Sequence, residues 1–160
     1  MGSRREETRT AARAAREDWT LLAITLSRRG LAPLQLQRSL HLLREAFPRD
    51  LGPDFYEFRS INSGQFSQEI YPDAQALASQ GVVAIEISEQ EGWQHYSATA
   101  AGIERARQLE SFLRPPVVDY LRRVVEWAST RSFDQLVRRP FGSDYSAPGI
   151  PVDSRPSTPR

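Results

Sequence analysis

The chain has 160 residues, of which 39% are hydrophobic, and its formal net charge is +1. A chain of this length buries one hydrophobic core, so we expect a single folded domain. It lacks Cys, which excludes disulfides and Cys-ligated zinc, and it has no apolar run as long as a membrane span. We therefore expect a soluble, cytoplasmic protein.

Composition divides the chain into three parts. Residues 1–16 are rich in Arg, Glu and Ala without an apolar stripe, which predicts a charged and partly flexible arm. Residues 17–139 carry the periodic apolar residues of the domain. Residues 140–160 are dense in Pro, Gly and Ser, which predicts a mostly disordered tail with Phe141 and Tyr145 as candidate anchors.

Six segments of the domain show the periodicity of an amphipathic helix. In one of them, Leu36, Leu40 and Leu43 recur at the spacing that places side chains on one helix face. The hydroxyl of Thr99 is expected to cap another helix by accepting a free amide of its first turn. The predicted helices span about 18–29, 34–47, 64–80, 99–114, 116–130 and 132–139.

Between the third and fourth helices the period changes to two. Val83 and Ile85 alternate with Ala84, and a second run of this kind follows a polar turn, which predicts an antiparallel hairpin over about 82–98. The aromatic run 55–58 is a candidate third strand beside it. We therefore predict an α+β, mainly helical winged-helix (winged helix-turn-helix) domain. It has a two- to three-stranded wing sheet and extra C-terminal helices.

Four motifs carry a resemblance to a known family. They are Phe55-Tyr-Glu-Phe, Gly64-Gln-Phe-Ser-Gln-Glu-Ile-Tyr, Gly81-Val-Val and Tyr96-Ser-Ala-Thr-Ala-Ala-Gly102. In this order they resemble the YwgA-like and Panacea (SocA-like) small bacterial winged-helix proteins, over roughly residues 19–139. Gln65 stands where Pro is usual, and Ala98 where a larger apolar residue is usual. Residues 71–77 are also similar, more weakly, to PadR-like repressors.

The Panacea-like resemblance implies an antitoxin-like or phage-defence accessory role, often carried out by binding a protein. It implies no enzymatic activity that can be carried over to this chain.

The distribution of charge bears on DNA binding. A winged helix places its recognition helix in the major groove and its wing on the backbone, where cations neutralise phosphates. Residues 60–104, where that helix and wing are expected, contain no Arg or Lys and six acidic residues, whereas the flanking segments are basic. Phosphates repel such a segment, so we predict a protein-interaction adaptor whose acidic helix and wing face a basic protein partner.

Two binding surfaces stay open at this point. The protein-binding surface comprises Gln65, Gln68, Glu69, Asp73, Glu86, Glu89, Glu91 and Trp93. The alternative is a DNA-binding transcriptional regulator whose phosphate contacts come from Arg28, Arg29, Arg38, Arg122 and Arg123. In either case the long helices between Thr99 and Thr130 are candidates to join a homodimer.

No segment of the sequence forms a recognisable active site. His41 and His95 are far apart in the chain, and neither has paired carboxylates at ligand spacing, so we expect no metal. The chain contains neither Lys nor a Gly-x-Ser-x-Gly segment, which excludes a lysine phosphate loop and a nucleophile elbow of that type. We expect no cofactor and no enzymatic activity.

Overall fold

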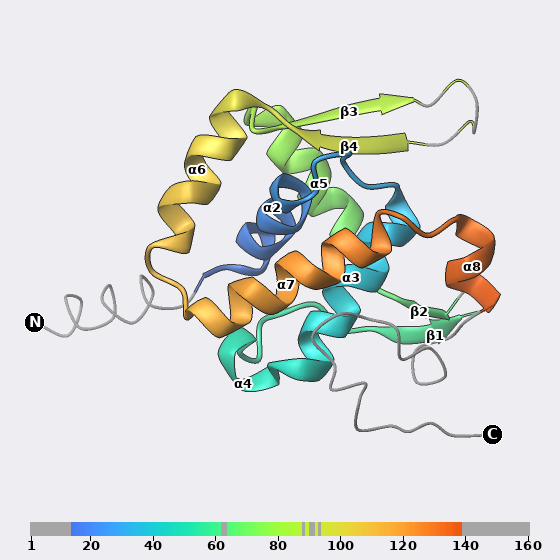
Figure 1. The fold of residues 1–160 in the computed structure, drawn as a ribbon, viewed down its shortest axis with the longest axis horizontal. Coiled ribbons are helices and arrows are strands. Elements are labelled where there is room, and N and C mark those ends of the chain that lie inside the picture. The colour runs from blue at the N-terminus through green and yellow to red at the C-terminus, as the bar shows by residue number, and fades with distance from the viewer. Residues whose placement is uncertain (1–13, 62–63, 88, 90–91, 93, 139–160) are drawn as a thin grey trace, which may run out of the picture.

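The structure is a computed structural model that describes residues 14–61, 64–87, 89, 92 and 94–138 (Figure 1). The predicted tail and nearly all of the predicted N-terminal arm lie outside these residues, as do Glu91 and Trp93 of the predicted protein-binding surface. In chain order the elements are α2 (Arg16–Leu26), α3 (Pro33–Ala46), α4 (Pro48–Leu51), β1 (Arg59–Ile61), β2 (Gly64–Phe66), α5 (Ile70–Ser79), β3 (Val83–Ile87), β4 (Gln94–Ala98), α6 (Ala100–Glu110), α7 (Pro115–Ala128) and α8 (Phe133–Arg138). This mixture of helices with two small antiparallel sheets confirms the α+β, mainly helical class.

Helix α2 forms the centre of the fold. Four consecutive residues, Leu21, Leu22, Ala23 and Ile24, are completely buried, so this helix is apolar on all sides rather than along one stripe. It contacts α3, α5, α6, α7 and β4, and Figure 1 shows it enclosed among them. Full burial of each leucine or isoleucine side chain contributes about 2 kcal/mol to the driving force for folding.

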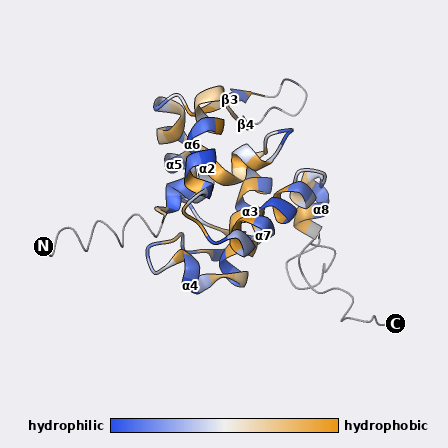
Figure 2. Cartoon of the chain, turned by 60° about the vertical axis from the view of Figure 1, so that its left-hand side comes forward, coloured by the Kyte–Doolittle hydropathy of each residue, from blue (hydrophilic) through white to orange (hydrophobic). Residues whose placement is uncertain are grey.

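Helix α7 is amphipathic and covers α2 and α3. Its buried residues Val117, Leu121, Val124 and Ala128 recur every three or four positions, as the sequence pattern predicts. Figure 2 shows hydrophobic and hydrophilic residues side by side along this helix. Prolines occupy its first turn, where the missing N–H group costs no intrahelical hydrogen bond.

Strands β3 and β4 form the predicted hairpin. They pair antiparallel, with Val83 opposite Ala98 and Ile87 opposite Gln94. On the other side of β4, Leu31 forms an isolated bridge with Tyr96, through two backbone N–H···O bonds of 2.8 Å. Leu31, in the connection between α2 and α3, therefore lies beside the hairpin in the position predicted for residues 55–58.

The prediction of a third wing strand over residues 55–58 is wrong. Phe55 and Tyr56 are consecutive and both buried, whereas adjacent residues of a strand point to opposite faces. Their rings meet edge to face at 5.1 Å, and the strand that follows, β1, pairs with β2 instead of the wing.

The helix predicted over residues 64–80 begins only at Ile70. Gly64–Phe66 is the strand β2, in which Phe66 lies opposite Arg59. Gly64 has a φ of 113°, and a Cβ atom at this position would collide with the guanidinium of Arg38. Residues 64–66 therefore form a strand because Gly64 adopts a positive φ and leaves room for the buried side chain of Arg38. Helical periodicity in the sequence does not reveal either feature.

Candidate binding surface

The start of α5 presents two of the predicted protein-binding residues. Gln68 and Glu69 are exposed, and Glu69 immediately precedes the first residue of the helix. The positive end of the helix dipole favours a negative charge at this position. Within the described part of the chain, no cation forms an ion pair with Glu69, so its charge faces solvent.

Asp73, predicted as the second acid of this surface, lies inside the junction between α2 and α5. Its Oδ2 accepts hydrogen bonds from the Tyr56 hydroxyl at 2.6 Å and from Nε of Arg16 at 2.9 Å. The Tyr56 oxygen also bonds Thr20 Oγ1 at 2.7 Å, and the guanidinium of Arg16 lies over the Tyr56 ring. Only 16% of the Asp73 side chain is exposed. Asp73 is therefore part of an internal polar network, which corrects its assignment to the partner surface.

Gln65 lies on β2 rather than on a helix. Its Nε2 donates to Ser60 Oγ across the β1–β2 hairpin at 2.7 Å, and its backbone oxygen accepts from Arg38 at 3.1 Å. The residue is half-buried. Its side chain stabilises the hairpin, and it does not share a helix face with Glu69.

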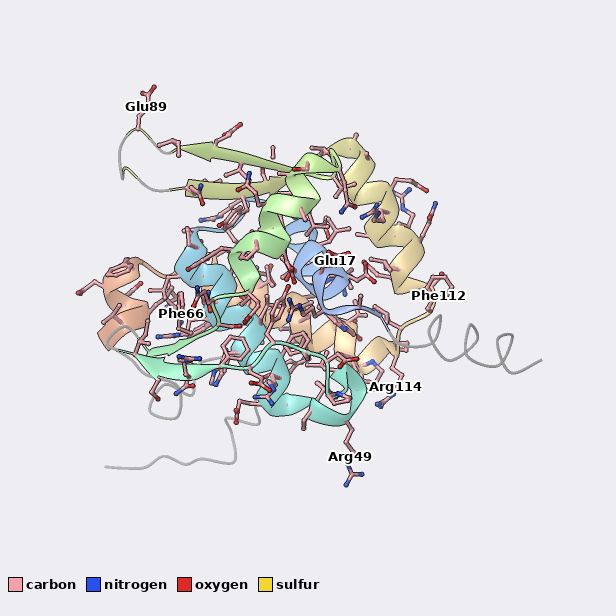
Figure 3. All side chains as sticks on the ribbon, turned by 180° about the vertical axis from the view of Figure 1, so that it is seen from behind. Glu17, Arg49, Phe66, Glu89, Phe112 and Arg114 are labelled. Atoms are coloured by element: carbon pink, nitrogen blue, oxygen red, sulfur yellow. The ribbon has the colours of Figure 1, made fainter. Side chains whose placement is uncertain are left out.

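The hairpin β3–β4 carries two more exposed acids. Glu86 lies on β3 and Glu89 in the turn that follows it, and Figure 3 shows Glu89 directed away from the body of the protein. His95 lies opposite Glu86 in the strand register, and its Nε2 is 2.6 Å from the backbone oxygen of Arg29. This bond ties β4 to the turn after α2 at the level of Glu86, so the hairpin is held against the body of the protein close to the two acids.

The buried Arg38 corrects the predicted phosphate-binding set. Its side chain is 3% exposed, and its Nη1 and Nη2 donate to the backbone oxygens of Gln65 and Leu136 at 3.1 and 3.4 Å. Burial lowers the pKa of this guanidinium from its ordinary value. Because Arg38 holds β2 and α8 against α3, it is not available to contact a nucleic acid.

The other predicted cations lie on the surface. Arg122 pairs with Asp119 at 3.1 Å and with Glu110 at 3.6 Å, so part of its charge is neutralised locally. Arg28, Arg29 and Arg123 are exposed. Within the described residues these last three form no ion pair, so they are the residues of the set whose charge is not shared with a neighbouring acid.

His41 is a buried titratable group on α3. It is 5% exposed, and its ring meets Phe58 edge to face at 5.1 Å. Burial first, and then the charges of Arg38 and Arg44, lower the pKa of His41 to about 4, from an ordinary value of 6.5. The folded protein therefore holds this imidazole neutral at neutral pH.

The lowered pKa of His41 predicts an acid-sensitive fold. Between pH 6.5 and 4 the unfolded chain binds a proton at His41 that the folded chain does not. The free energy of unfolding is expected to fall by up to about 3 kcal/mol across this window as the pH falls, and to gain nothing more from this group above pH 6.5. Urea unfolding of wild type, His41→Gln and the control His95→Gln checks this; equal pH slopes for all three would contradict it.

A groove of about 580 Å³, which no sequence pattern indicates, lies beside the start of α5. It is bordered by the first turn of α3, by β2, by α5 and by the segment that leads into α8. Phe66 lies beside α8 in Figure 3, and its ring centroid is 5.7 Å from that of Tyr71. The lining residues are Ala32, Pro33, Leu34, Gln35, Phe66, Tyr71, Arg131, Ser132, Phe133, Asp134 and Leu136.

Buried amide groups of α3 hold the walls of this groove. Gln37 is fully buried; its Nε2 donates to Ser67 O and its Oε1 accepts from Ser67 N, both at 2.9 Å. Gln35 Nε2 donates to Arg131 O at 3.0 Å, which fixes the segment before α8. Because both walls are bonded to the same helix, the groove is pre-formed, and its occupant does not have to order it.

The described residues contain neither a group of three or more His, Asp or Glu side chains placed to hold a metal ion nor a helix long and apolar enough to cross a membrane. Comparison of the chain with protein-family models, with curated proteins and with solved structures gives no match.

Proposed function

We propose that the chain is a non-catalytic winged-helix binding module that docks on a basic protein partner. The observation that carries this proposal is the position of Glu69. It is exposed at the start of α5, in the short segment that connects Phe66 and Tyr71, two aromatic walls of the groove. Apolar anchors beside an exposed charged rim are the usual composition of a protein interface.

The acids and the groove have separate tasks in this proposal. Glu69, Glu86 and Glu89 are exposed and, within the described residues, unpaired, so they attract a basic surface and orient it. Rim charges of this kind act mainly on the association rate, whereas like charges that a reversal brings together also cost affinity. Phe66, Tyr71 and Phe133 supply the area that holds the partner.

The order of elements supports the winged-helix assignment. Helix α2, the bridging residue Leu31, helix α3, helix α5 and the hairpin β3–β4 follow one another in the order of a winged helix-turn-helix. Residues 47–69 are inserted between the second and third of these helices, and they contribute β2 to the groove. The insertion adds an apolar binding element that a DNA-reading helix-turn-helix does not need.

DNA-binding regulation is the second candidate. Gln75 on the exposed side of α5 and Gln68 in the turn before that helix are able to read base edges, and Arg28, Arg29 and Arg123 are exposed. Against it, Arg38 is buried and Arg122 is ion-paired. Of the predicted set this leaves Arg28, Arg29 and Arg123 as unpaired, exposed cations within the described residues, and phosphate neutralisation gives such proteins most of their affinity.

Charge reversal tests the proposal. The triple variant Glu69→Arg, Glu86→Arg, Glu89→Arg is expected to lower capture of the protein partner by about tenfold or more, because the attraction becomes repulsion. Capture from a nuclease-treated lysate of the native host, followed by mass spectrometry, measures this. The control Asp54→Arg, Glu57→Arg, Glu126→Arg reverses three exposed acids elsewhere and should leave capture unchanged.

Two results would contradict the proposal. One is a partner that the triple variant and the control capture equally. The other is recovery of defined DNA fragments, lost at raised salt, that the triple variant binds more tightly than wild type. Two further roles stay predictions: the antitoxin-like or defence role that the resemblance implies, and a homodimer through α6 and α7, which a solution mass measurement tests.

A further inference from the structure

The groove opens where the described chain ends. Helix α8 begins at Phe133 and ends at Arg138, and three of its residues, Phe133, Asp134 and Leu136, line the groove. Residues 139–160 follow directly. The next part of the polypeptide therefore starts at the rim of an apolar site.

The segment that follows has the composition of a groove ligand. Phe141, Tyr145 and Ile150 are its large apolar residues, and they are separated by Gly, Ser and Pro with one Asp and one Ala. Proline-rich segments dock into grooves lined by aromatic side chains, because their extended backbone has little conformational entropy left to lose. Phe66, Tyr71 and Phe133 provide an aromatic lining of this kind.

The connection between α8 and Phe141 is long enough for Phe141 to reach the groove. Because the segment is tethered to the protein, even weak binding is sufficient for it to occupy the groove. Phe141 lies three positions after Arg138, the last residue of α8, and an extended chain of three residues spans about 10 Å. A connection of a few residues gives the attached segment an effective concentration of the order of millimolar. If the dissociation constant of the untethered segment for the groove is also about millimolar, the tail occupies the groove in about half of the molecules.

We infer that the groove of the free protein is occupied by the chain's own residues 140–152, with Phe141 and Tyr145 as anchors. The tail then competes with the protein partner, and a partner must displace it. This consequence rests on the proposed function, whereas the occupancy itself does not.

A spin label on the tail tests the occupancy. The chain has no Cys, so Ser146→Cys gives a single labelling site on the full-length protein. The label is expected to broaden the NMR amide signals of Leu34 and Tyr71, which line the groove and are far from the tail in sequence. Ile87 on the wing and Phe112 after α6 are exposed and should keep their intensity. Unchanged signals of Leu34 and Tyr71 would overturn the inference.

Anchor variants and mixed samples make the test specific. Phe141→Ser with Tyr145→Ser, in the labelled protein, should restore the signals of Leu34 and Tyr71, and the control Phe112→Ser should not. Broadening that persists in the anchor variant would overturn the role of the two aromatics. Broadening of isotope-labelled protein by a separate spin-labelled copy would show that a second molecule, not the chain's own tail, fills the groove.

Partner capture separates this inference from the proposed function. If the tail competes, the anchor variant should capture the partner severalfold better than wild type. If the spin label places the tail in the groove and capture does not change, the occupancy stands and the use of the groove by the partner is wrong. If capture rises without tail-dependent broadening, the occupancy is wrong.

Discussion

Replacing Asp73 with Ala is expected to lower the free energy of unfolding by about 3 kcal/mol, because it removes the acceptor at the centre of the internal network. The Tyr56 hydroxyl donates to Asp73 at 2.6 Å from a fully buried residue, and a hydrogen bond to a charged group contributes about 1.5–3 kcal/mol. The bond from Arg16 adds less than about 1 kcal/mol, because 36% of that side chain is exposed. Urea unfolding measured by circular dichroism gives the difference.

Two further variants make the Asp73 prediction specific. Glu69→Ala, four residues earlier and exposed, is the matched control and should change stability by less than about 0.5 kcal/mol. Asp73→Ala in a Tyr56→Phe background should cost less than in wild type, because both substitutions break the same bond. Equal costs in the two backgrounds, or equal effects of the Asp73 and Glu69 variants, would contradict the network.

The sequence predicts those parts of the fold that depend on neighbours in the chain. Thr99 caps α6 as expected, with its Oγ1 accepting the amide of Gly102 at 3.0 Å. The period-two pattern locates β3 and β4, and the apolar stripe of α7 locates a helix that packs on the core. Each of these signals is contained in a window of a few residues, where periodicity and capping rules apply.

The errors concern residues whose partners are distant in sequence. Asp73 fits an exposed helical position four residues after Glu69, but Tyr56 and Arg16, which bury it, lie 17 and 57 residues earlier. Arg38 likewise resembles a surface cation, yet it bonds the backbone of Leu136, 98 residues away. A charged residue is assigned to the surface by default, and only the folded partners show that this charge is inside.

The groove of the candidate site could not be predicted from the sequence for the same reason, because its lining residues are distant from one another in the chain. Leu34, Phe66, Tyr71 and Phe133 occur in four separate elements, and none of their local patterns indicates a shared cavity. Phe66 in particular fits the apolar face of the predicted helix 64–80, so sequence reasoning places it in the core. The signal that could have been used is Gly64, two residues before Phe66, because glycine readily adopts the positive φ that the structure shows there, in which a right-handed helix does not start.

Gly102→Ala is expected to destabilise the protein by about 3 kcal/mol, although the same substitution stabilises an ordinary helix by about 1 kcal/mol. Gly102 is buried in the first turn of α6, and a Cβ atom there would collide with the backbone oxygen of Val82. That oxygen already accepts the amide of Thr99 at 3.2 Å, so neither the strand nor the helix start is free to move. The collision with fixed backbone therefore outweighs the gain in helix propensity.

The opposing terms of Gly102→Ala can be separated with two controls. Gly92→Ala meets no atom within 4 Å but has a φ of 81°, so it should cost roughly 1 kcal/mol from backbone strain alone. Ala101→Gly, exposed one position earlier in α6, should also cost about 1 kcal/mol from lost propensity. Thermal and urea unfolding of the three variants rank them. If Gly102→Ala were as stable as wild type, α6 would not be held against Val82 as closely as the structure places it, and the base of the β3–β4 hairpin would be looser than the binding proposal requires.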